Sequence, residues 1–94
     1  MIRINCFFEV REDADTVEAV NLGVALVEKS RNDKGCVAYD LFQSTGRPRV
    51  MMFCETWVSQ ADLDAHAASE HFNTIVPRIE ALSLGGLKLE RFEF

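Results

Sequence analysis

The sequence lacks the features that would point to a nucleic-acid partner or a membrane. Its 94 residues carry a formal net charge of −5 and no cluster of Lys or Arg, so the protein would repel a phosphate backbone. Its uninterrupted apolar runs are far shorter than the roughly 20 residues that span a bilayer. We therefore expect neither nucleic acid nor a membrane among its partners.

Cysteine is scarce and carries no motif. Cys6, Cys36 and Cys54 are an odd number of widely spaced residues, with no C-x-x-C and no histidine at metal-ligand spacing. They are interpreted as small buried apolar side chains. The first residues, MIRINCFFEV, include the polar Arg3 and Asn5, and no apolar segment of signal-peptide length follows. We expect a cytoplasmic protein with no bound metal.

The sequence does contain the regular elements of one domain, residues 1–94. Alternating apolar residues predict strands, and a helical period from Asp15 to about Asn32 predicts a helix. Ser59 and Ser69 each fit a helix start. The expected strands cover residues 2–10, 36–44, 50–57 and 87–94, and the helical segments cover 15–32 and 59–82. The order β-α-β-β-α-β is the split βαβ of ferredoxin-like α+β folds with an antiparallel sheet.

Both faces of the expected sheet are apolar. The first three strands carry apolar residues at odd and even positions alike, which is typical of a sheet covered on both sides. The helices of this fold cover one face only. We therefore predict a homodimer in which a second subunit covers the other face, which would also add burial to a short chain with a modest core.

Histidine occurs twice, at His66 and His71. His66 follows Leu63 by three positions and Asp62 by four, so it shares their helix face and points towards the core. It could be a core-edge histidine that bonds Asp62 or a backbone carbonyl. In one continuous helix, five positions turn His71 well away from His66, and no third ligand is evident, so a shared metal is disfavoured.

A few other polar groups fall within apolar stretches. Glu55 and Trp57 share one face of the third strand, where a buried carboxylate is costly unless it is paired. Asn5 interrupts the first strand, Asn21 falls between valines on the expected inward stripe of the first helix, and Tyr39 brings a hydroxyl inward. Together these residues predict an apolar pocket with few polar groups, as in a small-molecule site.

Two segments, KGCVAYDLFQS and PRVMMFCETWVSQADLDAHAASEHF, resemble the antibiotic biosynthesis monooxygenase family of small dimeric α+β barrels. The similarity runs over nearly the whole chain. Its most specific part is E-x-W, a spacer and then H-x-x-S-x-H-F. These positions are Glu55, Trp57, His66, Ser69, His71 and Phe72.

This resemblance implies a ferredoxin-like dimer that oxygenates a small aromatic, quinol-like substrate with dioxygen and without a metal or flavin cofactor. His66 would be the base or proton shuttle. Asn5 and Trp57 would be further catalytic groups. The substrate would be bound by Tyr39, Glu55, Asn21, His71 and Phe72.

Other relatives of this fold suggest different activities. The haem-degrading oxygenases share Asn5, but their haem ligand aligns with about Val76 and their aromatic residue on the second helix is replaced by His66. Haem is therefore not expected. An isomerase or tautomerase with His66 as proton carrier, and a non-catalytic dimeric binding or stress-response module, remain the alternatives. A phosphorylated substrate would have to rely on Arg3, Arg47 or Arg49.

Overall fold

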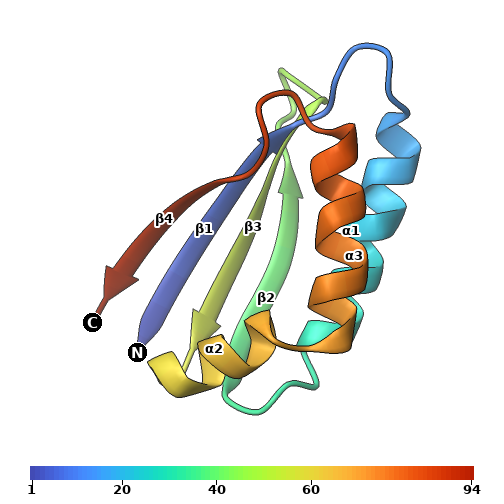
Figure 1. Ribbon diagram of the computed structural model, residues 1–94. Coiled ribbons are helices and arrows are strands. Elements are labelled where there is room, and N and C mark those ends of the chain that lie inside the picture. Colours follow the sequence, from blue (N-terminus) through green and yellow to red (C-terminus); the bar gives the residue numbers. More distant parts are fainter.

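A computed structural model describes residues 1–94 and contains four strands and three helices. The order β1, α1, β2, β3, α2, α3, β4 is the predicted ferredoxin-like α+β arrangement, with the second helix divided in two (Figure 1). The elements are β1 (Ile2–Glu9), α1 (Thr16–Ser30), β2 (Cys36–Gln43), β3 (Val50–Trp57), α2 (Gln60–Ala67), α3 (Glu70–Leu82) and β4 (Lys88–Glu93). No helix is long and apolar enough to cross a bilayer.

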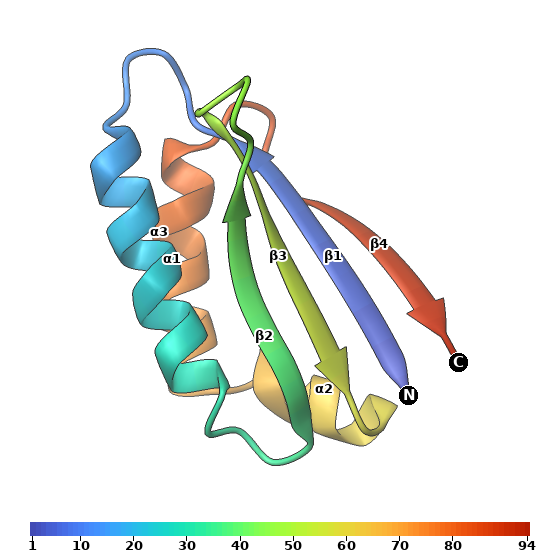
Figure 2. The same cartoon turned by 180° about the vertical axis from the view of Figure 1, so that it is seen from behind.

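The four strands form one antiparallel sheet in the order β2-β3-β1-β4. Helices α1 and α3 run side by side along the β2 half of the sheet, and α2 crosses near the end of β3 (Figures 1 and 2). The β1–β4 half extends away from these two long helices (Figure 1).

Serine and aspartate side chains begin all three helices. Asp15 accepts a hydrogen bond from the backbone N–H of Val17, Ser59 from that of Asp62, and Ser69 from that of Phe72. Such caps satisfy N–H groups that have no partner inside the helix. The two serine caps divide the predicted 59–82 segment into α2 and α3, and this break controls where the two histidines point.

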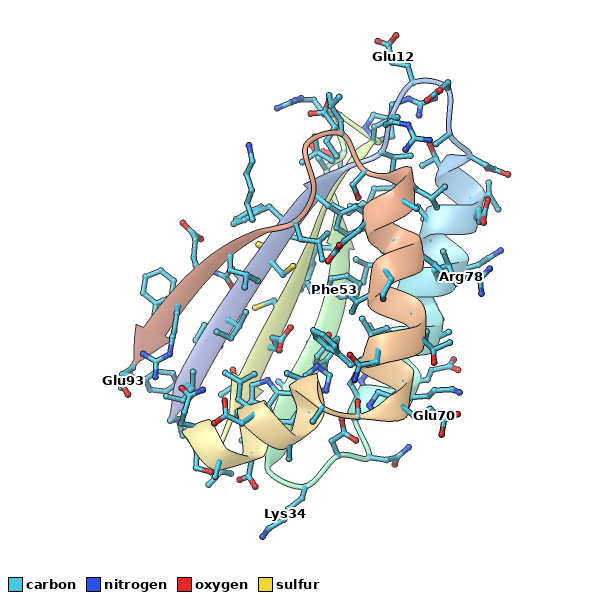
Figure 3. The ribbon with its side chains drawn as sticks, in the orientation of Figure 1. Glu12, Lys34, Phe53, Glu70, Arg78 and Glu93 are labelled. Carbon is cyan, nitrogen blue, oxygen red and sulfur yellow. The ribbon has the colours of Figure 1, made fainter.

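The core lies between the sheet and the helices. Its largest fully buried apolar side chains include Trp57, Leu26, Met51 and Ile79. Phe53 lies between the strands and the helices, whereas Glu70 and Arg78 on α3 point outward (Figure 3). The inner sheet face therefore carries the odd-numbered residues of β3 and the even-numbered residues of β1.

The inward phase predicted for α1 is wrong. Val17 and Val24 are exposed, and the buried positions are instead Ala19, Leu22, Gly23, Leu26, Val27 and Ser30. The buried stripe repeats at i, i+3, i+4 and i+7 from Ala19, and Val27 is the only valine of the helix that is buried. Asn21 is consequently exposed on the outside of α1.

The sheet face opposite the helices carries apolar side chains, as the sequence indicates, together with charged ones such as Arg3 and Asp40. Strand register brings Phe42, Met52 and Phe7 into one row across β2, β3 and β1. Phe42 and Phe92 are each about half exposed, at 53% and 50%. A partner on this face remains a prediction.

Candidate functional site

A cavity of about 390 Å³ lies between the inner face of the sheet and helices α2 and α3. Its walls are mainly apolar and include Ile4 and Phe53 from the sheet, Val76 and Ile79 from α3, and Leu87 and Leu89 at the β4 side. Its size suits a small organic ligand. The few polar side chains that reach it therefore determine what it can do chemically.

His66 is the most deeply buried polar group of the cavity wall. Its side chain is 1% exposed, and Nδ1 lies 2.8 Å from Oδ2 of Asp33, in the loop between α1 and β2. An ionised carboxylate can only accept hydrogen bonds, so this contact places the imidazole proton on Nδ1. The other nitrogen, Nε2, is buried without a protein partner. Nε2 is thus the nitrogen left to accept a proton from a ligand.

The environment keeps His66 neutral. Burial lowers the pKa of His66 below its ordinary value of 6.5, and this effect exceeds the opposing influence of the Asp33 hydrogen bond and charge. A neutral imidazole with its proton on Nδ1 can act as a base through Nε2 at neutral pH.

His71 does not turn away from His66. The prediction that five positions of one continuous helix would point the two side chains in different directions is therefore wrong. Nε2 of His71 lies 2.8 Å from the same Asp33 oxygen, and the two rings are 5.8 Å apart. The interruption at Ser69 rotates His71 back towards Asp33, which a single continuous helix would not do. His71 does not line the cavity that His66 lines.

Asp33, His66 and His71 could together hold a metal ion. Each offers one ligand atom, and the three atoms lie within 4.8 Å of one another. Three protein ligands are the usual number in a catalytic zinc site. A metal would have to replace both hydrogen bonds to Asp33, and it would take the Nδ1 atom that now carries a proton. The arrangement therefore fits a hydrogen-bonded cluster without further change and a metal only after rearrangement.

Glu55 and Trp57 form the second polar feature of the site. The indole N–H of Trp57 donates to Oε1 of Glu55 at 2.8 Å, and Glu55 is 5% exposed. Burial raises the pKa of Glu55 to about 7, although the hydrogen bond from Trp57 acts in the opposite direction. The Trp57 N–H is already bonded, so it is not a free donor for a substrate oxygen.

Aromatic rings surround His66. Trp57 lies against the imidazole with ring centroids 4.6 Å apart, Phe72 meets it edge-on at 5.2 Å and Tyr39 at 5.4 Å. Tyr39 and Phe72 also line the cavity, and burial raises the pKa of Tyr39 above its ordinary value. These rings fix the orientation of the imidazole and would exclude water from a bound ligand.

Trp57 and His71 lie next to His66 without lining the cavity, and two further expected site residues, Asn5 and Asn21, lie away from it. Asn5 faces the opposite side of the sheet, where its amide donates to Glu90 at 3.4 Å. Asn21 is exposed on α1. Strand alternation explains the position of Asn5, because Ile4 and Cys6 line the cavity and Asn5 between them must point away.

The sequence did not identify Asp33 as a residue of the site. It lies 33 positions before His66 in an NDKG segment that looks like an ordinary turn. No spacing rule links it to the histidines. The signal available was the need of a buried histidine for a hydrogen-bond partner.

Comparison with known proteins places the chain in a family. The model of the family "Antibiotic biosynthesis monooxygenase" matches residues 1–78. A crystal structure of a conserved protein from Bacteroides thetaiotaomicron, described as a possible oxidoreductase, is 40% identical with a TM-score of 0.91, and the match covers 99% of this chain and 96% of the other. A crystal structure described as an antibiotic biosynthesis monooxygenase is 32% identical with a TM-score of 0.93, covering 100% and 98%.

Sequence relatives agree with these structural matches. The Bacillus subtilis protein YcnE, named a putative monooxygenase, is 27% identical over 93 residues, which are 99% of this chain and 97% of that protein. An uncharacterised protein of Synechocystis sp. is 28% identical over 61 residues, and the match spans 42% of its length. The cavity, the buried histidine and these matches lead to one conclusion: the chain belongs to the antibiotic biosynthesis monooxygenase family.

Proposed function

We propose that the protein is a monooxygenase that oxidises a small hydroxylated aromatic molecule with dioxygen, without a metal or flavin, and that His66 is the base. The observation that carries this proposal is the unpartnered, buried Nε2 of His66 in the wall of an apolar cavity. The proposed reaction begins by removing a proton from the substrate. A neutral imidazole whose tautomer is set by Asp33 supplies this base.

The substrate class follows from the walls of the cavity. About 390 Å³ of mainly apolar space, bordered by Phe72 and Tyr39, suits a flat aromatic skeleton. The cavity lining contains no Lys or Arg, and its charged residues are the acids Glu55, Asp64 and Glu80. A phosphorylated or carboxylated substrate would find no partner there. A neutral phenol or quinol requires none.

The overall reaction balances without an external reductant. A ring carbon that carries two hydrogens in the keto tautomer becomes a carbonyl carbon, so one methylene group and one dioxygen give one carbonyl group and one water. All four electrons that reduce dioxygen come from the substrate. The protein has to remove a proton, exclude water and stabilise the anion, which its own side chains can do.

An isomerase or tautomerase is the second candidate. The observation that favours it is the presence of two proton-carrying groups, His66 and Glu55, in one cavity. A 1,3-proton shift needs such a pair and consumes no oxygen. The two candidates differ in their requirement for dioxygen.

Oxygen consumption by the purified, metal-free protein tests the proposal. Dihydroxynaphthalenes, anthrones and reduced quinones are the substrates, with His66→Gln as the variant and Asn21→Gln as the control on exposed α1. We expect uptake above the spontaneous rate, reduced about 10²–10⁴-fold by His66→Gln and unchanged by Asn21→Gln. The absence of uptake with every substrate, or uptake that returns only when zinc or iron is added, would contradict the proposal.

A further inference from the structure

Glu55 is a buried acid that has no role in the oxygenase reaction proposed above. It lies on the inner face of β3, level with Tyr39 of β2 and Ile4 of β1. Its side chain is 5% exposed and lines the same cavity as His66. Burying a carboxylate is costly unless something compensates for the lost water, so its position calls for an explanation.

No cation compensates Glu55. The titratable groups that line the cavity around it are Cys6 on β1, Tyr39 on β2, His66 and Asp64 on α2, and Glu80 on α3. None of these is a permanent cation. Arg91, which shares the register row on β4, bonds Gln60 and Glu93 instead. Glu55 takes part in no ion pair, and burial raises its pKa to about 7. Near neutral pH its carboxyl therefore holds a proton for much of the time.

The hydrogen bond from Trp57 orients this carboxyl. The indole N–H occupies Oε1, and the Trp57 ring lies against His66 with centroids 4.6 Å apart. One tryptophan therefore contacts both the carboxyl and the imidazole. The Tyr39 hydroxyl also acts on this carboxyl and, like Trp57, lowers its pKa. Because Trp57 engages Oε1 as an acceptor, the proton that the carboxyl donates would be carried on Oε2.

We propose that Glu55 is the proton donor of this site and works opposite His66 in each turnover. This role rests on the proposed oxygenase function. His66 first takes a proton from the substrate carbon at Nε2. The resulting anion transfers an electron to dioxygen, and the two radicals combine to form a carbon–oxygen bond and a peroxide anion. Glu55 then protonates the terminal oxygen of that peroxide.

The remaining steps restore both groups. The ionised Glu55 removes the second hydrogen of the same carbon as a proton, and this electron pair forms the carbonyl as the O–O bond breaks. The departing hydroxide takes the proton held by His66 and leaves as water. Glu55 is protonated again and His66 is neutral again, so the cycle converts one methylene group and one dioxygen into one carbonyl group and one water. A group that donates and then accepts a proton works best with a pKa near the working pH.

The variant Glu55→Gln tests this role in the full chain. Glutamine keeps an oxygen to accept the Trp57 N–H but has no acidic proton. Glu28→Gln, an exposed position on α1, is the matched control. We expect Glu55→Gln to lower kcat about 10²–10³-fold with little change in KM, and Glu55→Asp to recover part of the loss. Circular dichroism verifies that each variant is folded.

A second readout requires no substrate. Trp57 is the only tryptophan in the chain, so its fluorescence reports on the carboxyl bonded to it. Wild-type emission should change with a midpoint near pH 7, Glu28→Gln should do the same, and Glu55→Gln should lose that transition. Persistence of the transition in Glu55→Gln would overturn the assignment of the proton to Glu55.

The two proposals fail in different ways. If wild-type protein consumes oxygen and Glu55→Gln does so equally fast, the role of Glu55 is overturned while the oxygenase proposal stands. If wild-type protein consumes no oxygen with any substrate, the oxygenase proposal fails and the donor role built on it fails too.

Discussion

At the scale of single residues, Asp33 connects the two histidines. One oxygen, Oδ2, lies 2.8 Å from a nitrogen of each imidazole. It selects the His66 tautomer and opposes the effect of burial on the pKa of His66. Asp33 contacts His66 rather than the cavity, so its proposed part is to position the base and to stabilise it once it is protonated.

Replacement of Asp33 by Asn should weaken the base without emptying the cavity. The amide can donate to Nδ1 and so favour the wrong tautomer, with the proton on Nε2. We expect kcat for oxygen consumption to fall by about 10²–10⁴-fold, while binding of a substrate analogue changes little. Nitrogen-15 NMR of the imidazole checks the tautomer directly. Asp13→Asn, at an exposed site, is the control, and equal activity of the two variants would contradict this part for Asp33.

Glu55 and His66 should give the protein opposite dependences on pH. The raised pKa of Glu55 means that the folded state binds its proton more tightly, so stability is lost as pH rises from 4.5 towards about 7. At about 1.4 kcal/mol per pKa unit this difference approaches about 3 kcal/mol. The lowered pKa of His66 has the reverse effect, and its contribution is lost as pH falls below 6.5.

Urea unfolding between pH 5 and pH 8 measures the Glu55 contribution as the difference between wild type and Glu55→Gln. We expect Glu55→Gln to gain in relative stability as pH rises, by up to about 3 kcal/mol. A difference that does not vary with pH would mean that Glu55 is ionised in the folded protein throughout this range.

At the scale of elements, the break between α2 and α3 shapes the site. Oγ of Ser69 accepts from the N–H of Phe72 and donates to the carbonyl of His66 at 2.6 Å. One hydroxyl therefore ends one helix and starts the next. This change of direction brings His71 back to Asp33, so the site depends on a helix terminus as much as on its functional groups.

Ser69→Ala should cost about 1 kcal/mol of folding stability, because the first N–H groups of α3 lose their cap. Urea unfolding measures this cost, with the exposed Thr45→Ala as the control. We also expect the His71–Asp33 contact to loosen, which a changed nitrogen-15 chemical shift of His71 Nε2 would reveal. Identical unfolding curves for the two variants would show that the cap is dispensable.

The turn between α1 and β2 needs a glycine. Gly35 has φ of 78°, and a Cβ there would lie 2.1 Å from Oδ2 of Asp62. Gly35→Ala should therefore destabilise the protein by at least about 1–2 kcal/mol. Gly46→Ala is the matched control, since nothing lies within 4 Å of its added Cβ. Thermal unfolding compares the two, and equal melting temperatures would contradict the expectation.

At the scale of the whole molecule, one face of the sheet has no cover within the chain. All three helices pack on the other face (Figures 1 and 2). The uncovered face carries Phe7, Phe42, Met52 and Phe92, two of them about half exposed. Large apolar side chains exposed on an uncovered sheet face favour association, and a second copy of the chain is the occupant we propose.

Sedimentation analysis tests this proposal. We expect the wild-type protein to sediment as a dimer and Phe42→Glu to shift it towards the monomer, because a charge would be buried against apolar groups. Val17→Arg, on the exposed side of α1, should leave the dimer intact. A monomeric wild type at micromolar concentration would contradict the predicted dimer.

Local sequence patterns were enough to predict the element order and the α+β fold. Strand alternation placed Glu55 and Trp57 on one face, and the serine caps marked where α2 and α3 begin. These signals are local, because side-chain direction in a strand and cap chemistry in a helix depend on near neighbours. The direction of the Asn5 side chain also follows from strand alternation. It was predicted wrongly because both faces of β1 carry apolar residues.

The contacts among the polar side chains of the site, in contrast, depend on tertiary packing. Asp33 approaches His66 and His71 from a loop more than thirty positions earlier in the chain, and no periodicity encodes that contact. The inward phase of α1 depended on which stripe fits the sheet, so Ala19 is buried while Val17 and Asn21 are not. The burial that changes the pKa of Glu55 and His66 arises only when the sheet and helices enclose them. Local sequence patterns therefore determined the helices and strands, whereas tertiary packing determined which polar groups meet and how burial changes their pKa values.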